Sequence, residues 1–344
     1  KIIASFIDDG SRPLLSGDSS RLRRLSGERR ELYMAAAGVP LSNQGGENAE
    51  LEGLLAAIRS EIVTDGYAVI GDPITHSLSP AIHGAVFESL GCDSPYRSFL
   101  VPPPRLSFFV DRVRRSDIKG FNVTIPHKQA IMSLLDEIDD EARLCGAVNT
   151  VVNDQGRLVG YNTDMEGFKS SLADHGSDFA GPQNKRLAAG GIAFKAARSG
   201  AGRVTILAKR LDQADQAAER ARLHSSVQIN TGNLNPESLS LEAAGTDLLI
   251  NCTPLGMRGV GADFESFDFL DHLPKKAVVC DLIYNPARTR LLLESEKRGL
   301  TVLNGLGMLI HQAILADERF LNIKLDRAAL YQKVASALLG VTDK

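Results

Sequence analysis

One amine, one carboxylate and several neutral hydrogen-bonding side chains lie among apolar, strand-like runs of this 344-residue chain. They are Ser77, Ser79, Asn122, Thr124, Lys128, Asn149, Asn162, Thr163 and Asp164. Neutral hydroxyl and amide groups can bind the hydroxyls of a ligand without imposing charge on it. The set therefore indicates a site for a polyhydroxylated acid.

Lys128 is the candidate acid–base group of this site. A reaction that takes a proton from a substrate hydroxyl, or returns one to it, needs a side chain that can reach that hydroxyl. Two other interpretations stay open. A lysine that follows Pro126 at a helix start is commonly a solvated charge, and Asp164, just before the helix-like residues 165–172, is in position to cap that helix.

Alternating strands and helices have to position these side chains. The strands predicted in the first half are 67–70, 98–101, 121–124, 150–152 and 158–161. Helices are predicted after Pro80 and over 105–115, and this alternation argues for a parallel α/β sheet. The last two strands are joined by the short turn 154–156, as in a hairpin.

A second α/β set begins near Lys185. Its predicted strands are 204–207, 227–229, 247–251, 277–281 and 301–303. Such an order is typical of a nucleotide-binding domain. The tail, 308–339, has the apolar spacing of helices that pack back on the first domain.

The predicted fold class is therefore α/β, with two domains and a cleft between them. A substrate-binding catalytic domain with a mainly parallel sheet spans 65–164 and is completed by C-terminal helices within 308–344. A Rossmann-like domain spans 165–307, and the irregular residues 1–64 are interpreted as an N-terminal appendage.

The composition limits the class of partner. With 43% hydrophobic and 24% charged residues, the chain has the balance of a soluble globular protein. A net charge of -3 gives no basic excess, so nucleic acid is not an expected partner. No run approaches the ~18 apolar residues of a membrane span, and we expect a cytoplasmic protein. The four cysteines are far apart, so we expect buried thiols and no metal site.

At six segments the chain resembles the shikimate dehydrogenase family, over roughly residues 67–339. The segments are Ser77-Leu78-Ser79-Pro80, Asn122-Val123-Thr124-Ile125-Pro126-His127-Lys128, Gly146-Ala147-Val148-Asn149-Thr150, Gly160-Tyr161-Asn162-Thr163-Asp164, Thr253-Pro254-Leu255-Gly256-Met257 and Gly305-Leu306-Gly307-Met308-Leu309. Any one could arise by chance, whereas six in the family's order could hardly do so. The resemblance implies an NADP-dependent enzyme that reversibly reduces 3-dehydroshikimate to shikimate, in the biosynthesis of chorismate and the aromatic amino acids.

The resemblance also assigns roles in substrate binding. It pairs Lys128 with Asp164 as the catalytic acid–base couple. Ser77 and Ser79, helped by Tyr284, would hold the substrate carboxylate, although Ser79 before Pro80 is also a typical helix cap. The residues that would bind the ring hydroxyls are Asn122, Thr124, Asn149 and Gln312.

The cofactor half departs from the family pattern. The family has a strand of about five residues, then Gly-x-Gly-Gly and a helix, because the pyrophosphate rests on backbone N–H groups at the helix start. Here Gly190 and Gly191 align with the motif, Ala188 replaces its first glycine, and the strand and helix are both short. Either the protein has lost residues between Arg186 and Ser199, or the printed sequence omits some there. The second explanation is favoured because the family pattern resumes at once downstream.

Two cations stand where a nucleotide ribose would lie. Lys209 and Arg210 follow the strand 204–207, with no acidic residue to bind a ribose 2′-hydroxyl. They favour NADP over NAD, although a solvated basic turn is the other interpretation. By resemblance, the remaining cofactor-binding residues are Thr253, Gly256, Met257, Gly305 and Met308.

The first eight residues are similar to a strand of type I dehydroquinate dehydratases, which some organisms fuse ahead of shikimate dehydrogenase. That family has a His where Ile7 stands, and about sixty residues cannot close a barrel of ~250 residues. We interpret residues 1–64 as a dehydratase remnant or an incompletely represented domain, without activity.

Two alternatives to the main interpretation stay open. The first is a quinate/shikimate dehydrogenase that works with NAD. The second is a substrate-binding protein that has lost cofactor binding. We expect a small-molecule substrate as the partner and a monomer or homodimer.

Overall fold

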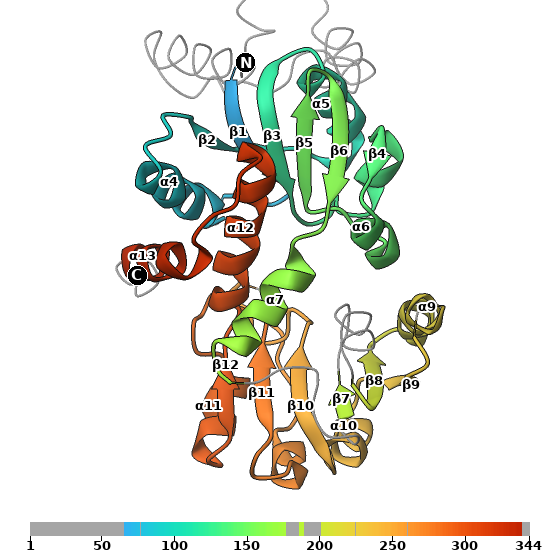
Figure 1. The fold of residues 1–344 in the computed structure, drawn as a ribbon. Helices are drawn as coiled ribbons and strands as arrows, with labels where there is room; N and C mark the ends of the chain where they lie inside the picture. The colour runs from blue at the N-terminus through green and yellow to red at the C-terminus, as the bar shows by residue number, and fades with distance from the viewer. Residues whose placement is uncertain are drawn as a thin grey trace, which may run out of the picture.

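The computed structural model describes residues 65–75, 77–176, 186–188, 201–223, 225–259 and 261–338, with only the backbone for 186–188. These residues form two six-stranded sheets with helices packed around them (Figure 1). The predicted α/β fold class is confirmed. The predictions made for residues 1–64 and for the segment that holds Gly190 and Gly191 lie outside the described residues.

The first sheet is mixed, with the order β2-β1-β3-β5-β6-β4. Its strands are β1 (Asp65–Gly71), β2 (Tyr96–Leu100), β3 (Asp117–Val123), β4 (Glu137–Ile138), β5 (Thr150–Asp154) and β6 (Arg157–Tyr161). β2, β1 and β3 run parallel, β4 runs parallel to β6, and β5 is antiparallel to both β3 and β6. The predicted hairpin is the β5–β6 pair. Gln155 and Gly156 turn the chain with positive φ at both residues, as tight hairpin turns require.

The second sheet is parallel throughout, with the order β12-β11-β10-β7-β8-β9. Its strands are β7 (Arg186–Ala188), β8 (Arg203–Ala208), β9 (Gln228–Asn233), β10 (Thr246–Asn251), β11 (Val278–Asp281) and β12 (Thr301–Leu303). Numbered from β7 along the chain, this is the 3-2-1-4-5-6 order of a dinucleotide-binding sheet. The order reverses between β7 and β10, the point at which such sheets bind their ligands.

The C-terminal helices pack against the first sheet, as predicted. α12 (Leu306–Leu321) and α13 (Arg327–Leu338) lie beside α4 (Ser79–Ser89), although more than two hundred residues separate α4 from α12 (Figure 1). Their apolar faces share one core, in which Ile82, Ile310 and Val334 are fully buried. The first domain therefore depends on chain that follows the second.

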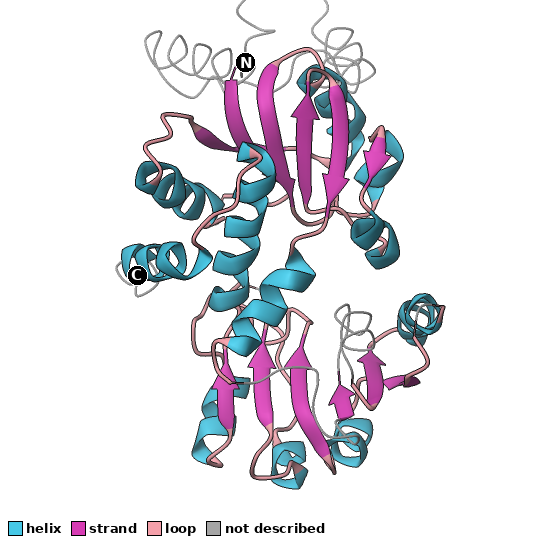
Figure 2. Ribbon diagram, viewed as in Figure 1, coloured by secondary structure: helices cyan, strands magenta, loops and turns pink. Residues whose placement is uncertain are grey.

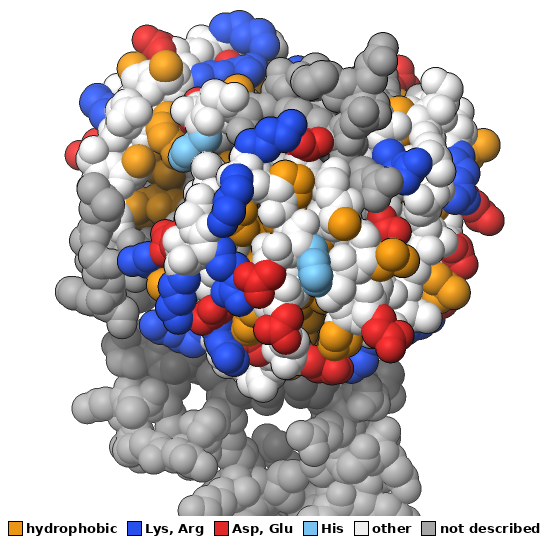
Figure 3. Space-filling view, turned by 90° about the horizontal axis from the view of Figure 1, so that it is seen from below, with side chains coloured by type: hydrophobic (Ala, Val, Ile, Leu, Met, Phe, Trp, Pro, Cys, Tyr) orange, Lys and Arg blue, Asp and Glu red, His pale blue; other side chains and the backbone are white. Residues whose placement is uncertain are grey.

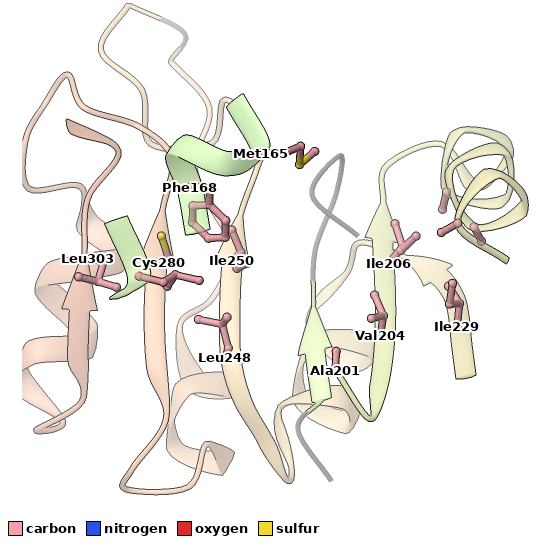
Figure 4. Close-up of a cluster of buried hydrophobic side chains, with 14 residues drawn as sticks. Met165, Phe168, Ala201, Val204, Ile206, Ile229, Leu248, Ile250, Cys280 and Leu303 are labelled. Atoms are coloured by element: carbon pink, nitrogen blue, oxygen red, sulfur yellow. The ribbon is translucent and has the colours of Figure 1, made fainter. Parts of the chain in front are cut away.

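α7 (Asp164–Ala173) leads from the first sheet to the second. Phe168 and Leu172 are buried in a core that includes Ile250 of β10 and Cys280 of β11 (Figure 4). Gly167 lies against α12, where an added Cβ would be 2.7 Å from the backbone nitrogen of Gln312. This close approach sets the position of α12, and with it that of the Gln312 side chain, relative to α7.

The remaining helical elements are η1 (Pro103–Arg105), α5 (Leu106–Val113), η2 (Ala130–Leu134), α6 (Asp140–Cys145), α9 (Leu211–Arg222), α10 (Pro236–Ala243), η3 (Asp268–His272) and α11 (Arg290–Lys297). The single helix predicted over 105–115 is thus a 3₁₀ turn followed by a short α-helix. Pro103 and Pro104 are the first two residues of this turn, where the fixed φ of proline suits the start of a helix.

The prediction of four buried thiols is wrong for three of them. Cys280 is buried within β11, whereas Cys92, Cys145 and Cys252 are partly exposed. These three lie at or just beyond the ends of α4, α6 and β10, where the chain leaves the core.

The molecular surface seen from the end of the second sheet carries basic and acidic side chains interspersed (Figure 3). In the described part of this face, basic side chains form a band left of centre, with acidic side chains beside it (Figure 3). Among the described residues, none of the helices is both long and apolar enough to cross a membrane. In the same part of the chain, His, Cys, Asp and Glu form no cluster of three or more that could hold a metal.

Candidate active site

The carboxyl ends of β3 and β6 lie at the edge of the first sheet that faces the second sheet (Figure 2). The strands of the second sheet point toward the same region (Figure 2). The register places Asn122 beside Thr150 and Thr150 beside Tyr161, so three strands present polar residues in one row. Ligands of α/β sheets bind at such carboxyl ends.

Lys128 and Asp164, which the family resemblance pairs, are in contact at this edge. Lys128 Nζ donates to Asp164 Oδ2 at 2.6 Å, and the two side chains are 31% and 19% exposed. The interpretation of Asp164 as a helix cap is wrong, because Thr163 is the N-cap of α7 and Asp164 is its first residue. The pair is partly shielded, yet a small molecule can reach it.

Asn149 is the centre of the cluster and is 2% exposed. Its Nδ2 donates to Asp164 Oδ1 at 2.9 Å, to Thr163 Oγ1 at 3.0 Å and to Gln312 Oε1 at 3.1 Å. Its Oδ1 accepts the backbone N–H of Thr163 at 2.9 Å. One amide therefore joins β5, α7 and α12 and orients the Asp164 carboxylate.

Asn122 occupies the end of β3 and is also buried. Its Nδ2 donates to the Asn149 carbonyl at 3.2 Å and to Thr150 Oγ1 at 3.1 Å. Thr124 follows on the same chain, with its backbone N–H bonded to the Ile70 carbonyl at 2.9 Å. The predicted hydroxyl-binding residues are thus brought together with Lys128.

Ser77 and Ser79 lie at the start of α4. The backbone N–H of Ser79 donates to Ser77 Oγ at 3.3 Å. Leu78 is the N-cap of this helix, which has no side-chain cap, so the interpretation of Ser79 as a helix cap is wrong. Ser77 is partly exposed at this position, whereas Ser79 is buried.

The carboxyl ends of β10 and β11 are joined by buried polar groups. Asp281 is fully buried and accepts hydrogen bonds from Thr289 Oγ1 at 2.6 Å and from Asn251 Nδ2 at 3.1 Å. Burial raises the pKa of Asp281, and the donors oppose that shift. Asn251 Oδ1 in turn accepts Thr253 Oγ1 at 2.6 Å. The loop that carries Thr253 is therefore anchored to the sheet.

Gly256 and Met257 lie on the same loop. Gly256 has φ +89°, a conformation that favours glycine. Met257 is 41% exposed, so it is available for contact and is not core filling. The N–H of Arg258 donates to the Asn285 carbonyl at 3.2 Å, which brings this loop beside that of Tyr284. Burial raises the pKa of Tyr284.

Gly305 and Met308 begin α12. An added Cβ on Gly305 would lie 2.0 Å from the carbonyl oxygen of Leu282, so a side chain has no room there. The Gly305 N–H donates to the Ile283 carbonyl at 3.1 Å. Met308 packs at the margin of the second core. These contacts bring the start of α12 to the carboxyl end of β11.

Lys209 and Arg210 follow β8, the second strand of the dinucleotide-type sheet. Both are exposed. Arg210 Nη2 pairs with Asp212 Oδ2 at 2.5 Å, and this hydrogen bond raises the pKa of Arg210 and lowers that of Asp212. Lys209 is thus the better placed of the two cations to bind a phosphate.

Sequence reasoning missed several members of the polar network. Thr150 links Asn122 to Asn149, and Tyr96 donates to Asn122 Oδ1 at 2.6 Å. Thr150 stands within a quoted motif and could have been found there. Tyr96 stands in no motif, and its position at the start of an edge strand gives no sequence signal.

A dinucleotide-type sheet opposite a lysine–carboxylate pair and a set of buried amides is the arrangement of a nucleotide-dependent oxidoreductase for hydroxylated substrates. The family model for the shikimate dehydrogenase substrate binding domain matches residues 69–151. A curated relative from Methanopyrus kandleri, named shikimate dehydrogenase (NADP(+)), is 41% identical over 260 residues, which are 74% of this chain and 89% of the relative. The chain belongs to the shikimate dehydrogenase family, as the sequence predicted.

Two solved structures are similar over most of the chain. Shikimate 5-dehydrogenase from Listeria monocytogenes, in complex with shikimate and NAD, is 31% identical with a TM-score of 0.70, covering 78% of this chain and 96% of that one. The enzyme from Thermus thermophilus, in complex with NADP(H) and shikimate, is 33% identical with a TM-score of 0.68, covering 80% and 100%. These likenesses confirm the two-domain fold.

Proposed function

We propose that this protein is an NADP-dependent shikimate dehydrogenase that interconverts 3-dehydroshikimate and shikimate. The observation that carries the proposal is the 2.6 Å contact between Lys128 Nζ and Asp164 Oδ2, held by the buried amide of Asn149. The curated relative and the solved structures bear names with the same substrate.

Lys128 is the proton donor of the proposed reduction. An ammonium group has three N–H donors, and only one is used by Asp164, so the others can reach the substrate carbonyl oxygen. As the carbonyl carbon gains a hydride, Lys128 passes a proton to the forming alkoxide and is later reprotonated from solvent. Asp164 stabilises the charged lysine, and Asn149 keeps the carboxylate in place.

Different side chains would bind the carboxylate and the ring hydroxyls of the substrate. The hydroxyls of Ser77 and Ser79 and the start of α4 would bind the carboxylate, helped by Tyr284. Side-chain amides and one side-chain hydroxyl would bind the ring hydroxyls of the substrate. The residues that carry them are Asn122, Thr124, Asn149 and Gln312.

The residues of the second sheet fit a dinucleotide. The strand order reverses at β7 and β10, and a cation stands at the end of β8, where a 2′-phosphate would lie. When bound, NADPH supplies the hydride. Lys209 and Arg210 would hold its 2′-phosphate, and Arg210 would have to leave Asp212 to do so. The loops that would border the nicotinamide carry Thr253, Gly256, Met257, Gly305 and Met308.

Steady-state kinetics test this function directly. Purified protein is given shikimate or quinate with NADP or NAD, and nicotinamide absorbance is followed. We expect the highest kcat/KM for shikimate with NADP. A higher kcat/KM for quinate would replace the proposed substrate, and no rise in absorbance with any pair would overturn the proposed activity. Monomer or homodimer, and a cytoplasmic location, remain predictions.

A further inference from the structure

Tyr96 joins the substrate cluster to a buried histidine–aspartate pair that the proposed chemistry does not use. It begins β2 and donates its phenol O–H to Asn122 Oδ1 at 2.6 Å. Its ring stacks on that of His83, with centroids 4.1 Å apart and planes 8° apart. Neither Tyr96 nor His83 belongs to the predicted site.

The hydrogen bonds from Tyr96 onward have only one consistent direction. The backbone N–H of Thr163 donates to Asn149 Oδ1, so that atom is an acceptor and Thr150 Oγ1, 2.9 Å away, has to donate to it. Thr150 therefore accepts from Asn122 Nδ2, at 3.1 Å. The amide oxygen of Asn122 then faces Tyr96, which has to be the donor.

This series of hydrogen bonds ends at Asp164 and Lys128. Asn149 Nδ2 donates to Asp164 Oδ1 at 2.9 Å, and Asp164 Oδ2 accepts from Lys128. Reversing the Asn122 amide would turn its oxygen toward the Asn149 carbonyl and toward Thr150 Oγ1, which already gives its proton to Asn149 Oδ1, so acceptors would face one another. The phenol of Tyr96 supports the observed orientation from the other side, as the donor to Asn122 Oδ1.

A buried pair behind Tyr96 holds its ring. His83 Nδ1 lies 2.6 Å from Asp317 Oδ1, and both side chains are fully buried. Among the described residues, His83 Nε2 and Asp317 Oδ2 have no hydrogen-bond partner. The histidine ring is thereby tied at one nitrogen and offers its flat face to Tyr96. Burial, with the charge of Asp317, raises the pKa of Tyr96 well above its usual value, so the phenol keeps its proton.

We propose that Tyr96 is a positioning residue for substrate recognition, which fixes the amide of Asn122 and, through Thr150, that of Asn149. The inference rests on the proposed function, in which these two amides bind ring hydroxyls of shikimate. Tyr96 acts through Asn122 and contacts no reacting atom. Its loss would leave Asn122 Oδ1 without the donor that holds it and would weaken shikimate binding more than the chemical step.

The test is Tyr96→Phe, which keeps the ring that stacks on His83 and removes only the hydroxyl. We expect KM for shikimate to rise roughly tenfold, as for one buried hydrogen bond left unmade. We expect kcat to stay within about threefold and KM for NADP to stay unchanged, since neither the proton donor nor the second sheet is touched.

Tyr67→Phe is the matched control. Tyr67 is the register partner of Tyr96 on β1, and its hydroxyl donates to the Phe320 carbonyl at 3.2 Å, away from Asn122. Its loss should leave KM for shikimate unchanged, while it removes a comparable hydroxyl from the same core.

Three results would overturn the positioning role while wild-type turnover of shikimate upholds the proposed function. The first is the same KM for Tyr96→Phe as for Tyr67→Phe. The second is an equal rise of KM for shikimate and NADP. The third is a Tyr96→Phe protein that fails to fold when Tyr67→Phe folds, because the hydroxyl would then serve the fold. A wild type without turnover would overturn the proposed function and this inference together.

Discussion

Replacing Gly167 by alanine tests how closely α7 and α12 must pack to build the site. The added Cβ would lie 2.7 Å from both Cβ and the backbone nitrogen of Gln312. Ordinary contact begins at 3.4 Å, so the helices would have to separate by about 0.7 Å. Backbone cannot rotate away as a flexible side chain can, and overpacking of this kind costs roughly 1–3 kcal/mol.

The same substitution also removes a flexible glycine from a helix, which stabilises by about 1 kcal/mol. Subtracting this gain from the steric cost leaves a smaller net effect, so we expect Gly167→Ala to lower the free energy of unfolding by up to about 2 kcal/mol. The shift would also move Gln312 away from Asn149, 3.1 Å from it at present, and raise KM for shikimate several-fold.

Urea unfolding followed by circular dichroism measures the first effect, and steady-state kinetics the second. Gly84→Ala is the matched control, because Gly84 is an exposed helical glycine of α4 with nothing within 4 Å of its would-be Cβ. That variant should be slightly more stable than wild type. The reasoning is refuted if Gly167→Ala is as stable as Gly84→Ala and its KM is unchanged.

Two further perturbations address charge. Lys209→Gln should raise KM for NADP roughly tenfold and leave KM for NAD unchanged, because it removes a cation expected at the 2′-phosphate. Equal changes in KM for both cofactors would contradict this expectation. Asp136→Asn should lower stability at neutral pH by about half a kcal/mol or less, since the Arg114 ion pair is partly exposed. The hydrogen bond from Arg114 and that from the Leu158 N–H hold the pKa of Asp136 below its ordinary 3.8. Its stabilisation is thus present above that value and is lost as pH falls through the lowered pKa. Urea unfolding at neutral and acidic pH checks this, and a difference that grows in acid would contradict it.

The sequence predicted β8, β10 and β11 of the second sheet well, because most of their residues on both faces are buried. β8 reads as a nearly continuous apolar run, and its inner four residues are buried. The lysine–carboxylate pair was also predicted, from motifs that follow β3 and β6. β3 and β6 both pair with β5 between them, so the ends of the two strands lie at one edge of the sheet and the two side chains can meet there.

Other parts of the site depend on contacts that no local pattern encodes. Gln312 reaches Asn149 across 163 residues only because α12 docks on α7. His83 pairs with Asp317 across 234 residues, and no sequence spacing links them. The start of α4 at Ser79 and the position of Asp164 within α7 were each misjudged by one residue, because the N-caps, Leu78 and Thr163, make no side-chain cap bond.

The central claim is that Lys128 carries the proton of shikimate oxidation. The decisive measurement is kcat for Lys128→Met at saturating NADP, together with calorimetric binding of shikimate. Lys119→Met, at an exposed position of β3, is the control. We predict that Lys128→Met lowers kcat by about a hundredfold or more while shikimate still binds and the control stays active. A Lys128→Met protein that turns over shikimate within a few-fold of wild type would contradict the account.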